Sequence, residues 1–111
     1  MTENKRVLLR HIKIAESKNE YYLRAHINED KDLVLSGQEF TSYAGDIFGD
    51  EEREYTKTIM NKDLPYLRNV LGISDGEDIL DYLLANYAGE KSFDFERLLD
   101  MKKVPFELTI R

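Results

Sequence analysis

A two-residue alternation between residues 21 and 28 constrains the fold of this chain more than any other feature of the sequence. One set of side chains in YYLRAHIN is apolar, comprising Tyr21, Leu23, Ala25 and Ile27. The alternating set is mostly polar, comprising Tyr22, Arg24, His26 and Asn28. Because successive side chains of a strand point to opposite faces of a sheet, the segment is predicted to be a strand with one buried face.

Strands are also predicted on both sides of this segment. Residues 6–14, RVLLRHIKI, are rich in β-formers but apolar on both faces, with Arg10 interrupting one of them. A polar turn at residues 16–20 joins the two strands as an antiparallel hairpin. A second polar turn, at 29–32, leads to a third strand at 33–35, and residues 54–60 form a fourth.

The end of the chain, residues 104–111, alternates again. Its apolar set is Val104, Phe106, Leu108 and Ile110. Pro105 lacks the N–H that a ladder hydrogen bond needs, so we expect it at the start of this strand or on a sheet edge.

Helical spacing appears in four places. Ser36 and Gly37 break the third strand, and the apolar residues that follow repeat at helical intervals, namely Phe40, Tyr43, Ala44, Ile47 and Phe48. Residues 61–71 form a second helix that ends at Gly72. Ser74 and Glu77 have the spacing of a capping box, which predicts a third helix behind them. Ser92 is expected to cap a last helix.

Together these elements predict an α+β fold made as one domain, residues 1–111. The order is β-β-β-α-β-α-α-α-β, with a mostly antiparallel sheet and helices packed on one face. A chain of 111 residues with 41% hydrophobic residues can bury a core without crosslinks. It contains no cysteine, which excludes disulfides and thiolate chemistry.

Charge and hydropathy narrow the classes of partner. The formal net charge is −6, which disfavours nucleic acid and anionic lipid because phosphate contacts supply most of that affinity. The apolar runs are a few residues long, against about 20 for a membrane span, and the first residues lack the apolar core of a signal peptide. We therefore expect a soluble, cytoplasmic protein.

Motifs for catalysis or cofactor binding are weak in this sequence. His11 and His26 lie in neighbouring predicted strands, but the residues that share their faces are poor metal ligands. The acidic run between Asp46 and Glu54 lacks the ligand spacing of a calcium loop. Ser36-Gly37 lacks the preceding glycine of a nucleophile elbow, and there is no phosphate-binding loop. No catalytic residue, cofactor site or metal site is predicted.

Negative charge gathers in two regions. Residues 45–54 contain five acidic residues and one basic, and residues 74–100 contain eight acidic and two basic. A one-sided acidic surface steers a basic partner towards it, and tyrosines are enriched at binding hot spots. The predicted partner-binding residues are Asp46, Asp50, Glu51, Glu52, Glu54, Asp78, Asp81 and Tyr82, with Tyr66 as a further candidate anchor.

A resemblance points the same way. Leu35-Ser36-Gly37-Gln38, then Phe48-Gly49-Asp50 and Glu54-Tyr55, resemble an L-x-G-Q, F/W-G-D and E-Y pattern in a group of small bacterial α+β proteins. The resemblance implies a similar fold over most of the chain. Small acidic proteins of this shape often serve as immunity proteins or inhibitors. Where the group carries a second aromatic residue after E-Y, this chain has Thr56-Lys57.

The expected function is that of a stoichiometric inhibitor or immunity protein against a toxin or effector with a basic surface, and not of an enzyme. Two alternatives remain open. One is a homodimeric interaction domain that pairs through an edge strand, with the chain a monomer or weak homodimer. The other is a small hydrolase, which requires a concave pocket with titratable groups of shifted pKa.

Overall fold

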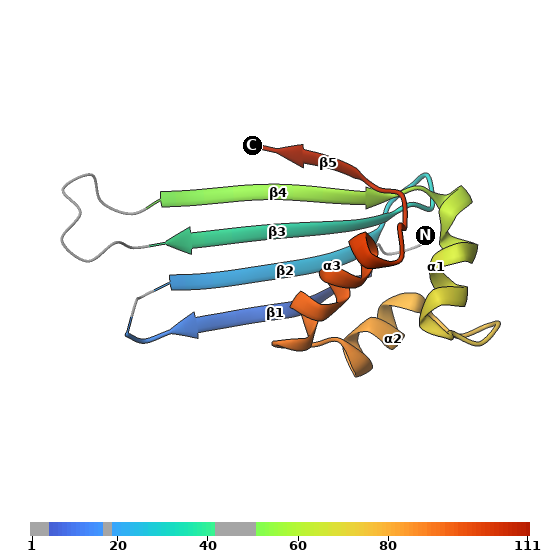
Figure 1. Cartoon of the computed structure of the whole chain (residues 1–111), viewed down its shortest axis with the longest axis horizontal. Coiled ribbons are helices and arrows are strands. Elements are labelled where there is room, and N and C mark those ends of the chain that lie inside the picture. Colours follow the sequence, from blue (N-terminus) through green and yellow to red (C-terminus); the bar gives the residue numbers. More distant parts are fainter. Residues whose placement is uncertain (1–4, 17–18, 42–50) are drawn as a thin grey trace.

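A computed structural model describes residues 5–16, 19–41 and 51–111 of the chain. Five strands form one sheet, and each pairs antiparallel with the next along the chain (Figure 1). The strands are β1 (Arg6–Ile14), β2 (Asn19–Ile27), β3 (Leu33–Thr41), β4 (Glu51–Ile59) and β5 (Glu107–Ile110). This arrangement confirms the predicted α+β class and its antiparallel sheet.

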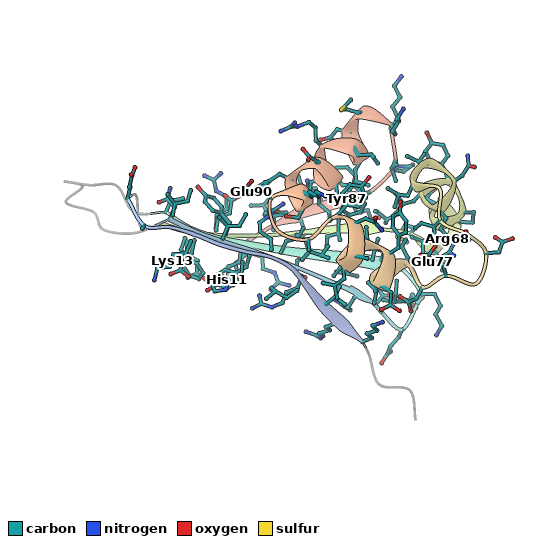
Figure 2. The ribbon with its side chains drawn as sticks, turned by 90° about the horizontal axis from the view of Figure 1, so that it is seen from below. His11, Lys13, Arg68, Glu77, Tyr87 and Glu90 are labelled. Atoms are coloured by element: carbon teal, nitrogen blue, oxygen red, sulfur yellow. The ribbon has the colours of Figure 1, made fainter. Side chains whose placement is uncertain are left out.

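The helices lie together on one face of the sheet (Figures 1 and 2). They are a 3₁₀ turn at Asn61–Asp63, α1 (Leu64–Leu71), α2 (Ile79–Asn86) and α3 (Lys91–Met101). Leu67, Leu83 and Phe95 are fully buried between these helices and the sheet. None of the helices in the described part of the chain has the length and apolar character that a membrane crossing requires.

The alternation in β2 is confirmed by burial. Leu23 and Ala25 are fully buried beneath the helices, while Arg24 is exposed on the other face. On β3 the partners of these two residues are Gly37 and Leu35, which therefore share their face. The core is thus continuous across the middle of the sheet.

A β-bulge explains the mixed pattern of β1. The pairing with β2 shifts between Leu8 and Arg10, so that the chain between them gains one residue. Val7 is buried before the shift, Leu9 is buried within it, and Arg10 is buried directly after it, at 1% exposure. Before the bulge the inward-facing residues of β1 have odd numbers, and after it they have even numbers. A simple alternation of polar and apolar residues cannot reveal this change.

The expected break at Ser36 and Gly37 is wrong. β3 runs through both residues to Thr41, and Phe40 pairs with Glu20 on one side and Glu52 on the other. Phe40 is therefore a strand residue and not the start of a helix. The rest of that predicted helix, at 42–48, lies outside the described residues. β4 begins at Glu51, three residues before the predicted start of the fourth strand, so Glu51 and Glu52 are strand residues.

The predicted capping box is also wrong. α2 begins at Ile79, and its N-cap is Asp78, whose Oδ1 accepts hydrogen bonds from the N–H groups of Leu80 and Asp81 at 2.8 and 3.1 Å. Ser74 instead closes a turn, since its carbonyl accepts the N–H of Glu77 at 3.1 Å. Asp78, four residues after Ser74 and directly before the apolar run, supplies the cap instead.

Gly37 makes room for an aromatic ring. A Cβ atom built on Gly37 would lie 2.1 Å from Cζ of Tyr55, its cross-strand partner. The Tyr55 hydroxyl donates a hydrogen bond to Oε1 of Glu96 on α3 at 2.7 Å, which fixes the ring in this place. The ring of Tyr55 thus fills the space that a side chain at residue 37 would take. Glycine at this position lets the strand and the ring pack together.

We expect Gly37→Ala to lower the free energy of unfolding by about 1–3 kcal/mol, the usual cost of overpacking. The added methyl group must push the Tyr55 ring away from Glu96. Urea unfolding of the variant, alone and combined with Tyr55→Ala, measures the effect. In the Tyr55→Ala background the cost should largely vanish, because the clash partner is gone. An equal cost in both backgrounds would contradict this packing.

Candidate functional site

Among the described residues, one face of the sheet carries no helix, and this face holds the best candidate for a functional site. His11 and Lys13 point away from the helices on this face (Figure 2). Aromatic and acidic side chains gather at the end of the sheet where β3 ends and β4 begins. We define the aromatic–acidic patch as His11, Glu20, Tyr22, Gln38, Phe40, Glu52 and Glu54.

Strand register places these residues in two rows across the sheet. In the first row Phe40 lies between Glu20 and Glu52. In the second row His11, Tyr22, Gln38 and Glu54 follow one another across β1 to β4. Directly opposed residues of antiparallel strands bring their Cβ atoms within about 5.5 Å. The patch is therefore a contiguous surface built from four strands.

Tyr22 is the centre of the patch. Its ring stacks on the His11 imidazole at 4.4 Å between centroids and 16° between planes. The Phe40 ring meets it edge-on at 6.0 Å and 83°. The Arg24 guanidinium lies 5.3 Å from the centroid of the same ring. These contacts fix the ring in place on a sheet, where little side-chain freedom is left to lose on binding.

Carboxylates surround this aromatic centre. The Tyr22 hydroxyl donates a hydrogen bond to Oε2 of Glu20 at 2.8 Å. That hydrogen bond lowers the pKa of Glu20 and raises the pKa of Tyr22. On the other side the Gln38 amide donates to Glu52 at 2.9 Å and to Glu54 at 3.3 Å. Glu20, Glu52 and Glu54 thus present negative charge on two sides of the rings.

A shallow hollow of about 180 Å³ adjoins the patch. Its lining includes Arg24, Gln38, Glu54 and Thr56. Small-molecule sites usually measure about 300–1,000 Å³, so this hollow has the size for one or two side chains of a partner. It extends the patch towards β5.

The predicted binding residues divide into separate groups in the structure. Glu52 and Glu54 belong to the patch. Asp46 and Asp50 lie outside the described residues, and only the backbone of Glu51 is described, in β4. The acidic side chains of α2 are on the opposite side of the sheet, where α2 lies close to β1 (Figure 1).

The side chains of α2 are also engaged within the chain. Asp78 caps the helix, and Asp81 forms an ion pair with Lys5. The Tyr82 hydroxyl donates to the carbonyl of Leu71 at 2.8 Å, and its ring packs against the core. The structure therefore does not bring Asp78, Asp81 and Tyr82 together with the β4 carboxylates.

Sequence patterns pointed to part of the patch only. The alternation in residues 21–28 placed Tyr22 outward, but its neighbour Phe40 had been assigned to a helix. His11 pairs with Tyr22, whereas His26 pairs with Arg6, so the two histidines do not converge. Partial burial, with a smaller contribution from Arg6, lowers the pKa of His26. In the described ranges no three histidine, aspartate or glutamate side chains gather in a way that could hold a metal.

A second polar cluster lies under α3, on the helix-bearing face. Arg10 donates from Nε to Oγ of Ser92 at 2.6 Å, and its guanidinium lies 3.6 Å from the centroid of the Phe93 ring. Glu96 lies 3.5 Å from Arg10 and 3.9 Å from Lys57. Burial and the Glu96 carboxylate raise the pKa of Tyr55. This cluster attaches α3 to the sheet and is structural.

Comparison of the chain with models of known protein families, with curated proteins and with solved structures finds no match in any of the three. Function must therefore be argued from the geometry of the chain. The aromatic–acidic patch lies on the sheet face that no described helix covers, with His11 and Glu52 exposed and Tyr22 and Phe40 half-buried. The side chains of the cluster beneath α3 are instead engaged mainly with one another. The patch is the stronger candidate for contact with another molecule.

Proposed function

We propose that this chain is a protein-binding module that acts as a stoichiometric inhibitor or immunity protein against a partner with a basic surface. The observation that carries the proposal is the aromatic centre at Tyr22, with carboxylates on two sides, on the sheet face that no described helix covers. The proposal includes a cytoplasmic site of action, where such an inhibitor would meet a toxin or effector.

The chemistry of the patch fits arginine or lysine side chains of a partner. Aromatic faces attract cations through their quadrupole, most strongly when water is excluded. Carboxylates accept the fork of N–H donors that a guanidinium presents. Tyr22 combines an apolar ring with a polar tip, which is typical of residues that dominate binding energy. An arginine of the partner beside the Tyr22 ring would lie next to Glu20, whose carboxylate accepts the Tyr22 hydroxyl.

Charge over the whole chain supports the same partner. The net charge of −6 draws a basic protein towards this surface over distances of about a Debye length. Two cations of the chain border the patch, since Arg111 lies 3.9 Å from Glu54 and Lys13 lies 4.0 Å from Glu20. These exposed pairs are weak and can exchange for a partner's cations.

Affinity capture tests this proposal. The tagged chain should retain one basic protein from an extract of the source organism, in a near-equimolar ratio after washing. The variant Glu52→Lys/Glu54→Lys should lose at least about 90% of that protein, because reversed charges repel a basic surface. Quantitative mass spectrometry of the eluates measures the loss.

The matched control is Asp75→Lys/Asp100→Lys, which changes the net charge by the same amount at exposed positions outside the patch. It should retain the partner at nearly the wild-type level. Equal retention by all three proteins would contradict a role for the patch. Equal loss from both variants would show that net charge alone, and not this surface, governs binding.

A further inference from the structure

The two edges of the sheet differ in how they are protected. At the β1 edge the bulge interrupts the strand, and the carbonyl of Leu9 accepts the N–H of Gly89 at 2.6 Å. That edge is therefore partly closed by the segment between α2 and α3. At the other edge β5 is regular, and within residues 5–16, 19–41 and 51–111 it pairs with β4 alone (Figure 1). An unprotected edge is a template for pairing with another strand.

Backbone geometry shows which groups of β5 face outward. The N–H of Arg111 donates to the carbonyl of Glu54 at 3.0 Å, and register continues with Thr109 opposite Thr56. In an antiparallel pair the hydrogen-bonded residues alternate. The N–H and C=O groups of Leu108 and Ile110 therefore point to the free edge, while those of Glu107, Thr109 and Arg111 point to β4.

The side chains of the same segment also divide by face. Leu108 and Ile110 are 52% and 66% exposed. They line a groove of about 280 Å³ on the helix-bearing face, together with Tyr55 and Lys57. By parity, the side chains at 107, 109 and 111 lie on the opposite face. The chain thus leaves two large aliphatic side chains uncovered beside a free edge.

We propose that two copies of this chain associate through antiparallel pairing of β5 with β5 about a two-fold axis at Thr109. Only residues whose N–H and C=O groups face outward can form the new hydrogen bonds. Three registers meet this condition: Leu108 opposite Leu108 of the second copy, Leu108 opposite Ile110, or Ile110 opposite Ile110. Of these registers, the one with Leu108 opposite Ile110 also places Glu107 of each copy opposite Arg111 of the other.

Self-complementarity selects this register. It joins two Glu107–Arg111 pairs of opposite charge on one face and two Leu108–Ile110 pairs on the other. Thr109 meets its own copy at the axis. Opposite charges, aliphatic pairs and threonine pairs are all favourable when directly opposed across strands. A two-fold interface requires this kind of self-match. The segment is short, so the association is weak and depends on concentration.

The pairing has a consequence for the open face. A two-fold axis normal to an antiparallel sheet keeps the same face of both copies on the same side. The dimer would present two aromatic–acidic patches on one surface, although the dimer itself does not depend on what the patches bind. A partner with two basic sites would then gain from avidity.

Crosslinking tests the register directly. The chain has no cysteine, so Thr109→Cys introduces a single thiol. Non-hydrogen-bonded partners lie about 4.5 Å apart at Cα, within the range for a disulfide. Under mild oxidation we expect covalent dimers of Thr109→Cys to form about tenfold faster than those of Glu107→Cys, because effective concentrations of paired groups reach the mM range. In the proposed register Glu107 is four residues from its own copy, or about 13 Å.

Exchanging the charges at residues 107 and 111 tests the same register independently of the crosslinking. Glu107→Arg and Arg111→Glu should each abolish concentration-dependent dimerisation, measured by sedimentation up to about 1 mM. An equimolar mixture of the two variants should dimerise again, because each chain supplies the charge that the other lacks. Equal crosslinking rates for the two cysteine variants, or a wild-type chain that stays monomeric up to about 1 mM, would overturn the proposal.

Discussion

Glu96→Ala is expected to lower the free energy of unfolding by about 3–5 kcal/mol, which is the usual cost of removing one partner of a buried ion pair. Arg10 is 1% exposed, and its Nη2 has no hydrogen-bond partner among the described residues. The carboxylate of Glu96, 3.5 Å away, supplies the compensating charge. Without it the guanidinium is left buried beside the Ser92 hydroxyl and the ring of Phe93, with no carboxylate to balance its charge.

The control for this prediction places Glu96→Ala in an Arg10→Met background. If the unpaired cation causes the loss, the cost of Glu96→Ala should fall to about 1–2 kcal/mol, since the hydrogen bond from Tyr55 and the Lys57 pair are still lost. Urea denaturation of the four proteins gives the coupling energy. A cost that is the same in both backgrounds would show that Arg10 does not depend on Glu96.

Tyr22→Ala is expected to weaken binding of the captured partner by at least about 30-fold, the level that defines a binding hot spot. The substitution removes the ring that stacks on His11 and contacts Phe40. Tyr22→Phe keeps the ring and removes only the hydrogen bond to Glu20, so it should retain most of the affinity. Surface plasmon resonance with immobilised partner measures both constants.

Tyr66→Ala is the matched control for Tyr22→Ala. Tyr66 is 45% exposed on α1, outside the patch, and its hydroxyl donates to the carbonyl of Lys102. Its truncation removes an exposed ring of the same kind and should change the affinity less than about twofold. Similar losses for the two alanine variants would indicate a general effect on the chain and would contradict a hot spot at Tyr22.

Local alternation predicted most of the sheet. The bounds of the strand at residues 6–14 and the inward set of the segment at 21–28 match β1 and β2. The place of Pro105, just before the edge strand β5, is also confirmed. These features depend on side chains within one strand, so a period of two is sufficient to find them.

Features that depend on a second strand escaped prediction. Gly37 suggested a break, because the ring that fills its place belongs to Tyr55, 18 residues away along the chain. Phe40 matched a helical stripe, yet its partners are Glu20 and Glu52. The bulge in β1 likewise depends on pairing with β2. The patch itself is assembled by register, and of its residues only Glu52 and Glu54 had been predicted to bind a partner.

The charge pattern of the sequence indicated that the protein surface is acidic, but it did not show where the available carboxylates lie. The acidic residues of α2 raised the expectation of one continuous surface, but Asp78 is a helix cap and Asp81 an ion-pair partner of Lys5. Counting charges along the chain cannot separate acids that complete local structure from acids that stay available. The pairing of residues across the strands distinguishes these two classes of acid, because it shows which carboxylates border the aromatic centre at Tyr22.

The most direct test of the proposed function is a calorimetric titration of the purified partner with the wild-type chain and with Glu52→Lys/Glu54→Lys at low salt. The proposal predicts saturation at one chain per partner site for the wild type. It also predicts an affinity at least about 100-fold lower for the variant, with an unchanged melting temperature. Wild-type affinity in the variant at low salt would contradict binding through the aromatic–acidic patch.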